Sequence, residues 1–188
     1  ASLALSIAAH AALFLAVPGL TGAARWIART GALLVAVYAT TDVVYVAMDL
    51  AYRAAGRRAP PIHDHPALAR TVGEFWSRRW NRIVGQWLAD VVFGPVTRRL
   101  SARAGVVATF AVSALIHAYL AHAALCDWTM TAWMACFFLA QGAIVLVESA
   151  LGIGRLRPAL GRAWTITALV ATSPLFLEPA GRAIGAPP

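Results

Sequence analysis

Hydrophobic residues gather in five long runs along the chain, and the stretches between the runs contain most of the charge. A helix needs roughly 20 apolar residues to cross the hydrocarbon core of a bilayer, which is about 30 Å thick. Four runs approach or exceed that length, and the fifth is shorter and contains Pro174. The pattern predicts an all-α, polytopic membrane helix bundle with about five spans, over residues 2–20, 32–52, 105–125, 128–151 and 164–177.

The segment between the second and third runs, residues 53–104, is predicted to contain an amphipathic helix. Residues 53–66 are rich in Pro, Gly and Arg, which is typical of irregular chain. From 67 to 93 the hydrophobic pattern is helical, and Gly94-Pro95 is expected to end the helix. One arc of its helical wheel is apolar and the other is polar, so we expect the helix to lie in the membrane interface. The apolar arc contains Trp76, Trp80, Ile83, Val84, Trp87, Leu88 and Val91, and the polar arc Arg78, Arg82, Gly85 and Gln86.

The overall composition excludes an ordinary soluble domain. Hydrophobic residues make up 60% of the chain, charged residues only 13%, and the mean hydropathy is +0.68. The first apolar run lacks the basic start and the clear cleavage site of a signal peptide, so we interpret it as a true span. The sequence therefore predicts a single membrane domain over residues 1–188.

The basic residues predict the orientation of that domain. All sixteen are arginines, and five spans would place thirteen of them on one side of the membrane and three on the other. Because basic loops stay in the cytoplasm, the N-terminus and residues 53–104 are expected to be cytoplasmic. The net charge of +8 is then explained by topology and by attraction to anionic lipid or cofactor phosphate, and nucleic acid is not an expected partner. The arginine-only set is typical of GC-rich bacterial genomes, which suggests a bacterial cytoplasmic membrane.

A stripe of polar residues follows one face of the second run. Its members recur at steps of four and three residues, so they share one side of a helix. Two carboxylates facing lipid would be costly, and the stripe should face the bundle interior or a wet cavity. Lining a cavity and structural pairing with loop arginines are equally supported interpretations. For Glu148, near the end of its own run, we expect snorkelling to the interface or an arginine partner. The stripe consists of Tyr38, Asp42, Tyr45, Asp49 and Tyr52.

Among the histidines, His117 lies deepest in an apolar run, with Ser113 one turn before it. An ionisable ring at that depth is costly unless it is used or satisfied. No zinc spacing or disulfide framework is present, since Cys126 and Cys136 would be too far apart along one helix to join. A haem held by His10 and His117 is the main cofactor alternative. His63 and His65 flank Asp64, but two imidazoles and one carboxylate without a supporting ligand from elsewhere are weak evidence for a metal site, and a solvated turn is the expected structure.

Two sequence motifs resemble those of the membrane-bound O-acyltransferase family, and most closely its wax-synthase-like branch. Phe75-Trp76-Ser77-Arg78-Arg79-Trp80-Asn81 is similar to the family's Phe-Trp-x-Arg-Arg-Trp-Asn segment. Val112-Ser113-Ala114-Leu115-Ile116-His117 looks like its Ser-small-aliphatic-aliphatic-His motif on a span. Both occur in the family's order, and together they are more specific than either alone.

The resemblance implies transfer of a fatty acyl group from acyl-coenzyme A to a hydrophobic, long-chain alcohol, with no permanently bound cofactor or metal. His117 would be the general base, for which its ordinary pKa of about 6.5 is suitable. Asn81 would bind the oxyanion or orient the imidazole, and the sequence alone does not distinguish these two roles. The expected substrate-binding residues are Trp76, Arg78, Arg79, Trp80, Arg82, Trp87, Asp42, Tyr45 and Ser113.

Three departures from the family pattern shape these expectations. Ala118 stands where many relatives have an acidic residue directly after the motif histidine, so acidic assistance would have to come from elsewhere, such as Asp42. Residues 82–87 lack the histidine of sterol and diacylglycerol acyltransferases, which favours the wax-synthase-like branch. Family members have more spans than five, so the chain is expected to be an incomplete copy or to need a partner subunit or an oligomer. A non-catalytic, lipid-binding scaffold is the remaining alternative.

Overall fold

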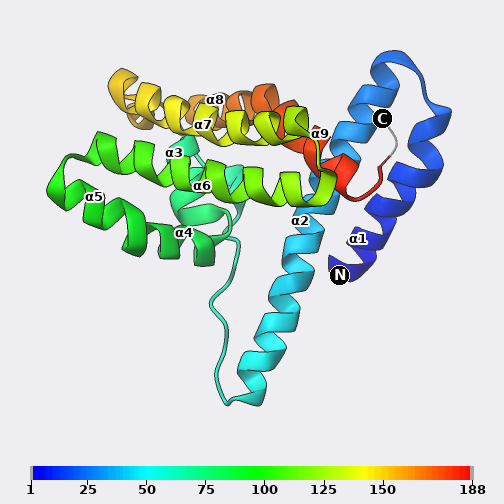
Figure 1. Cartoon of the computed structure of the whole chain (residues 1–188), viewed down its shortest axis with the longest axis horizontal. Coiled ribbons are helices and arrows are strands. Elements are labelled where there is room, and N and C mark those ends of the chain that lie inside the picture. The colour runs from blue at the N-terminus through cyan, green and yellow to red at the C-terminus, as the bar shows by residue number, and fades with distance from the viewer. Residues whose placement is uncertain (1, 187–188) are drawn as a thin grey trace. The chain divides into compact units, whose positions relative to one another are not determined.

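The computed structural model describes residues 2–186, and within this range it contains helices and no β-strand (Figure 1). The expected all-α membrane fold is confirmed. The chain forms two compact units, one made of residues up to Pro61 together with those from Ala180 onward, and one made of Ile62–Pro179. The single membrane domain stays a prediction, and its ends, residues 1 and 187–188, lie outside the described residues.

The N-terminal unit contains two apolar helices that pack against each other (Figure 1). Helix α1 (Ser2–Ala11) continues through a π-helical turn (Ala12–Ala16) and a 3₁₀ turn (Val17–Gly19). Helix α2 (Gly22–Ala54) has 33 residues, so at 1.5 Å per residue it is about 50 Å long and exceeds the thickness of a hydrocarbon core. It contains the second expected span, residues 32–52, and is longer than that apolar run.

Two members of the polar stripe on α2 bind the chain that follows the helix. The Asp49 carboxylate accepts the backbone N–H of Ala59 at 3.0 Å and the Nε–H of Arg53 at 2.7 Å. The Tyr45 hydroxyl donates to the carbonyl of Ala59 at 3.2 Å. These contacts are structural, and they hold the irregular residues 55–61 against the end of α2.

Helices α6 (Ala102–Leu125) and α7 (Trp128–Leu151) form the centre of the second unit and lie side by side (Figure 1). Cys126 adopts the left-handed conformation that ends α6, and the Asp127 carboxylate caps the first N–H groups of α7. The two helices approach closely where Gly142 faces Phe110, since a Cβ at Gly142 would lie 2.8 Å from that of Phe110. Both helices match the expected spans within three residues.

The first and fifth apolar runs differ from simple spans. The structure contains three helices that are long and apolar enough to cross a membrane, and a fourth candidate is a bent pair, among the described residues. That pair is α8 (Pro158–Thr172) and α9 (Pro174–Ala183), which meet at an angle of 51° because Pro174 cannot continue the hydrogen-bond ladder of α8. Within the first run, the part of the chain that the structure describes contains a shorter apolar helix, Ile7–Gly19, which ends just beyond Pro18.

The amphipathic segment is not one helix from 67 to 93, and that prediction was wrong. It contains α3 (Val72–Glu74), a π-helical turn (Phe75–Arg79), α4 (Arg82–Leu88), a second π-helical turn (Ala89–Phe93) and α5 (Gly94–Arg99). The helix breaks at Trp80–Asn81 because the backbone groups on either side of the break form hydrogen bonds with residues 62–64. The backbone N–H of Asp64 donates to the carbonyl of Arg79, and the backbone N–H of Arg82 donates to the carbonyl of Ile62. Gly94-Pro95 begins α5 instead of ending the helix, since proline fits a first helical turn.

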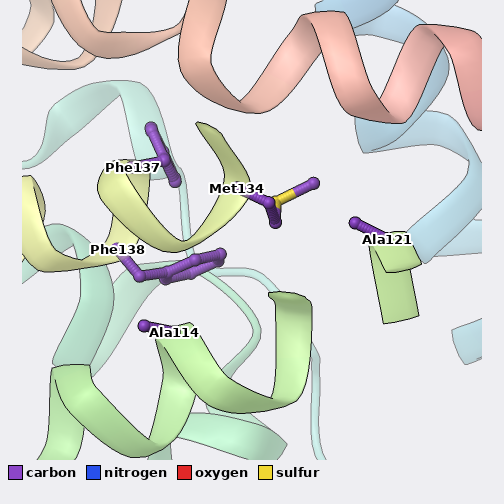
Figure 2. Close-up of a cluster of buried hydrophobic side chains, with 5 residues drawn as sticks. All are labelled: Ala114, Ala121, Met134, Phe137 and Phe138. Carbon is purple, nitrogen blue, oxygen red and sulfur yellow. The ribbon is translucent and has the colours of Figure 1, made fainter. Parts of the chain in front are cut away.

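An aromatic core joins these elements within the second unit. Its buried members are Ala114 and Ala121 of α6 and Met134, Phe137 and Phe138 of α7 (Figure 2). The ring of Phe138 reaches from α7 toward Ala114 (Figure 2). Trp76 of the first π-helical turn and Phe176 of α9 pack against this cluster. The core therefore fixes the Trp/Arg-rich motif beside the helix that carries His117.

Replacing Gly142 by alanine is expected to destabilise the protein, because the new methyl group would push α6 and α7 apart at Phe110. We expect the free energy of unfolding to fall by about 1–3 kcal/mol, the usual cost of overpacking a core. Thermal unfolding of the purified protein in detergent measures it. Gly31→Ala is the matched control, since a Cβ there meets nothing within 4 Å and alanine favours a helix; equal stability of the two variants would contradict the prediction.

Candidate active site

His117 is held in one orientation by its own helix. Its Nδ1 lies 2.8 Å from the backbone carbonyl oxygen of Ser113, one turn earlier on α6. A carbonyl can only accept, so this bond requires the proton to be on Nδ1 and leaves Nε2 of the neutral ring as an acceptor. The ring also stacks on Phe138, with centroids 4.0 Å apart and planes 30° apart. The geometry therefore selects one tautomer and one ring plane.

Asn81 occupies the break between the first π-helical turn and α4. Its φ of 39° and ψ of 59° are left-handed, a conformation that asparagine tolerates better than most residues. The Asn81 Oδ1 accepts a hydrogen bond from the backbone N–H of Val84 at 3.5 Å, and the backbone N–H of Asn81 donates to Nδ1 of His63 at 3.3 Å. Because Oδ1 faces the start of α4, the Nδ2 group is the part of the carboxamide that is left for a ligand.

His117 and Asn81 line the same cavity, whose volume is about 470 Å³. Its walls come from the motif segment, α4, α6 and α7, and most of them are apolar. This combination of an apolar wall and a few converging polar groups is typical of small-molecule sites. The apolar lining includes Trp76, Trp80, Val84, Leu88, Phe93, Val106, Phe110, Phe138 and Val145, and the polar lining Ser77, Arg78, Asn81, Thr109, Ser113 and His117.

A second, polar cavity of about 340 Å³ adjoins the first. The two share Ser77 and Arg78, so the Arg78 side chain borders both. Arg70 adds a second guanidinium, whose Nη2 donates to the carbonyl of Leu156 and whose buried Nε has no hydrogen-bond partner within the described residues. A ligand with an apolar chain and an anionic group would match this pair of cavities. The polar cavity is lined by Arg70, Thr71, Glu74, Ser77, Arg78 and Gly154.

The expected site residues divide into three groups. Trp76, Arg78, Trp80 and Ser113 line the cavity together with His117 and Asn81. Arg79, Arg82 and Trp87 do not, and the Trp87 side chain is 48% exposed, which fits contact with lipid. Asp42 and Tyr45 lie on α2 in the other unit, and their place in a binding site stays a prediction.

Arg79 does not line the cavity and instead binds the motif segment to neighbouring residues of the chain. Its Nε donates to the Glu74 carboxylate at 2.6 Å, and its Nη1 donates to the carbonyl of Asp64 at 3.1 Å. Burial by itself raises the pKa of Glu74, but the hydrogen bonds from the Arg70 backbone and from Arg79 outweigh it and hold that pKa below its usual value. Arg79 is therefore committed to an internal ion pair.

Two polar residues of α7 are buried: Glu148, for which the sequence predicted a different environment, and Gln141, which the sequence did not single out. Glu148, 4% exposed, neither snorkels nor pairs with an arginine; it accepts the backbone N–H groups of Val72 and Gly73 and the indole N–H of Trp164. Gln141, fully buried, accepts the indole N–H of Trp76. Their signal was present, since two polar residues seven apart in an apolar run share a helix face.

The described residues contain no group of three His, Cys, Asp or Glu side chains that could hold a metal ion. His63 stacks near Trp80, with ring centroids 4.4 Å apart, and turns its Nδ1 to the Asn81 backbone. His65 instead bonds Asp64 at 3.1 Å, and this hydrogen bond lowers the pKa of that carboxyl. The His63-Asp64-His65 stretch thus has structural contacts to explain it.

Known proteins resemble the part of the chain that contains this site. Residues 59–140 match the family described as "Membrane bound O-acyl transferase family". The chain is 34% identical to "Probable long-chain-alcohol O-fatty-acyltransferase 2" of Arabidopsis thaliana over 119 residues, 57% of this chain and 34% of the relative. It is 35% identical to number 1 of that series over 106 residues, 50% of this chain and 30% of the relative.

The chain is also 28% identical to "Probable long-chain-alcohol O-fatty-acyltransferase 3" of Arabidopsis thaliana over 160 residues. This match covers 76% of this chain and 46% of the relative. The chain spans about a third of the length of the first two relatives. No solved structure matches it. Residues 59–140, with Asn81 and His117 among them, therefore match the membrane bound O-acyl transferase family, and this part of the chain is similar to plant proteins named as probable long-chain-alcohol O-fatty-acyltransferases.

Proposed function

We propose that this integral membrane protein transfers a fatty acyl group from acyl-coenzyme A to a long-chain alcohol. The observation that carries the proposal is the cavity shared by His117 and Asn81, with the Nδ1–H of His117 bound to the Ser113 carbonyl. This bond leaves Nε2 as the group that can accept a proton. The names of the similar plant proteins supply the expectation of a long-chain alcohol.

In the proposed reaction His117 acts first as a base and then as an acid. Nε2 takes the hydroxyl proton while the alcohol oxygen attacks the thioester carbonyl carbon, which gives a tetrahedral oxyanion. The C–S bond then breaks, the ester leaves, and the proton passes from Nε2 to the departing thiolate. While the ring is an imidazolium, the Ser113 carbonyl accepts a hydrogen bond from its Nδ1–H. This carbonyl orients the ring, as an acidic partner does in other active sites.

Asn81 is proposed to stabilise the oxyanion. Its Oδ1 is engaged with the N–H of Val84, so Nδ2 is the donor that remains for the negative oxygen. One such donor contributes about 2.7–4 kcal/mol to transition-state stability in enzymes where it has been removed. Because the cap and the left-handed backbone hold the carboxamide before a substrate arrives, little reorganisation is needed.

The two cavities give a basis for recognising the acyl donor. The apolar cavity suits the fatty chain and the alcohol, and the polar cavity with Arg70 and Arg78 suits the phosphates of coenzyme A. The thioester would then lie between them, beside Arg78. Arg79 has no part in this step because Glu74 neutralises it.

The proposed topology places the N-terminus and residues 53–104 in the cytoplasm, where acyl-coenzyme A is available, as the distribution of the arginines favours. The membrane would be a bacterial cytoplasmic membrane. Membrane lipid is the proposed surrounding, and a second copy or a partner subunit would complete the reaction chamber.

Membranes that contain the protein are expected to convert labelled acyl-coenzyme A and a long-chain alcohol into a lipophilic ester. A panel of alcohols of rising chain length and a sterol, followed by thin-layer chromatography and mass spectrometry, identifies the acceptor. Membranes without the protein are the control. Absence of ester with every alcohol would reject the enzyme and favour a lipid-binding scaffold.

His117→Ala is expected to lower the turnover number by about 10²–10⁴-fold, the usual contribution of a general base. The protein's abundance in the membrane should not change, because the ring lies at a cavity wall. His122→Ala is the control, since His122 is on the same helix but bonds Thr131 and does not line the cavity. Retained activity in the His117 variant would rule out the base assignment.

Arg78→Gln is expected to raise the KM for acyl-coenzyme A about tenfold or more and to leave the KM for the alcohol nearly unchanged. The reason is the loss of a charge-assisted hydrogen bond, roughly 1.5–3 kcal/mol, to the phosphates alone. Steady-state kinetics with each substrate varied in turn measures both constants. Arg99→Gln, at an exposed arginine of α5 that lines neither cavity, should change neither value; equal effects of the two changes would point to general surface charge.

A further inference from the structure

One face of α7 contacts both catalytic motifs. Phe138, Gln141, Val145 and Glu148 are spaced by three, four and three residues, so they lie along one side of the helix. Phe138 stacks on the His117 ring, and Val145 lines the cavity. The other two bind the motif segment before Asn81 by hydrogen bonds, and we name Gln141 and Glu148 the α7 anchor pair.

Glu148 binds the start of the motif segment. Its Oε1 accepts the backbone N–H of Val72 at 2.6 Å, and its Oε2 accepts that of Gly73 at 3.1 Å. These are the first two N–H groups of α3, which have no partner inside their own helix. The third, that of Glu74, is capped by the Thr71 hydroxyl at 2.9 Å. A side chain from a helix 75 residues further along the chain thus completes the cap.

Gln141 binds the same segment one turn later. Its Oε1 accepts the indole N–H of Trp76 at 3.2 Å, and its Nε2 donates to the Thr172 hydroxyl at 2.7 Å. The Thr172 hydroxyl in turn donates a hydrogen bond to the carbonyl of Ala168 at 2.8 Å. Both ends of this fully buried carboxamide therefore have a hydrogen-bond partner. Through Gln141, the position of Trp76 is fixed by α7 and α8 together.

Packing alone does not explain why these two positions are polar. The aromatic core around Phe137 and Phe138 already supplies the apolar contact between α7 and the motif segment. Apolar surfaces can slide past one another with little change in energy, whereas hydrogen bonds to two N–H groups and one indole define a register. A buried carboxylate also costs solvation energy, which its three donors offset at this one position of the segment.

We propose that Gln141 and Glu148 are positioning residues that set the register of residues 72–81 relative to His117, and so keep Asn81 at the cavity wall. The proposal rests on the proposed function for its catalytic meaning, and on the hydrogen bonds for its structural part. Neither side chain lines the cavity, so both act through the segment that they hold.

The test compares the wild-type protein with Glu148→Gln and Gln141→Met, each purified into lipid nanodiscs. Glutamine at 148 would turn an NH₂ group toward an N–H donor, and methionine at 141 keeps the volume but removes both hydrogen bonds. Amide hydrogen exchange of peptides covering residues 70–81 is measured beside steady-state kinetics and thermal unfolding. The control is Asp90→Asn, an exposed carboxyl that bonds only Gln86 among the contacts described.

We expect exchange of the 70–81 peptides to rise at least tenfold in both anchor variants, with other peptides and the unfolding midpoint nearly unchanged. The turnover number should fall at least tenfold, and Asp90→Asn should leave exchange and turnover as in the wild type. Unchanged exchange, or faster exchange with full turnover, would overturn the proposal. If Glu148→Gln fails to fold, Gln141→Met alone decides by the same two measurements. If the wild type transfers no acyl group, the proposed function fails, while the exchange of residues 70–81 still decides whether the pair holds the segment.

Discussion

The hydrogen bond from the Nδ1–H of His117 to the Ser113 carbonyl is the interaction on which the proposed chemistry depends. It is made within one helix turn, and a backbone carbonyl cannot change its protonation state. The ring therefore has a defined tautomer without an acidic neighbour, which accounts for the alanine at position 118. Stacking on Phe138 further restricts the plane of the ring. The proposed base can thus be oriented in an apolar site without a second buried charge, which would be costly there.

The partner motif has a different kind of support, because it lies on short and irregular helical turns that could not be stable alone. Its backbone is held by contacts from distant parts of the chain: the residues 62–64 on one side, and α7 with its buried polar side chains on the other. Rigid, long helices therefore carry the histidine, and a segment built from tertiary contacts carries the asparagine. Helix α7 binds the segment that carries Asn81, and Phe138 of the same helix stacks on the imidazole of His117. The positions of both side chains are therefore set relative to one helix.

Local patterns predicted the parts of this structure that depend on neighbouring residues. The apolar run 128–151 predicted both ends of α7, whereas the span expected over 164–177 is bent at Pro174, between α8 and α9. Periodicity failed over residues 67–93, because the partners that interrupt the helix at Asn81 are backbone groups of residues 62–64, which no wheel represents. Glu148 was misjudged for the same reason, since its two backbone donors lie some 75 residues earlier in the chain. The two motifs identified His117 and Asn81, but only the fold places them at one cavity.

The left-handed backbone at Asn81 limits which side chains evolution or design can place there. Glycine and aspartate are the other residues that accept this conformation at low cost, and most others would strain the turn before any chemistry is considered. Glycine would keep the turn and lose the carboxamide, and aspartate would keep the cap at Val84 and bring an anion to the cavity wall. The backbone thus reduces the substitutions that leave the turn intact to a short set, in which asparagine alone combines a neutral donor with a helix cap.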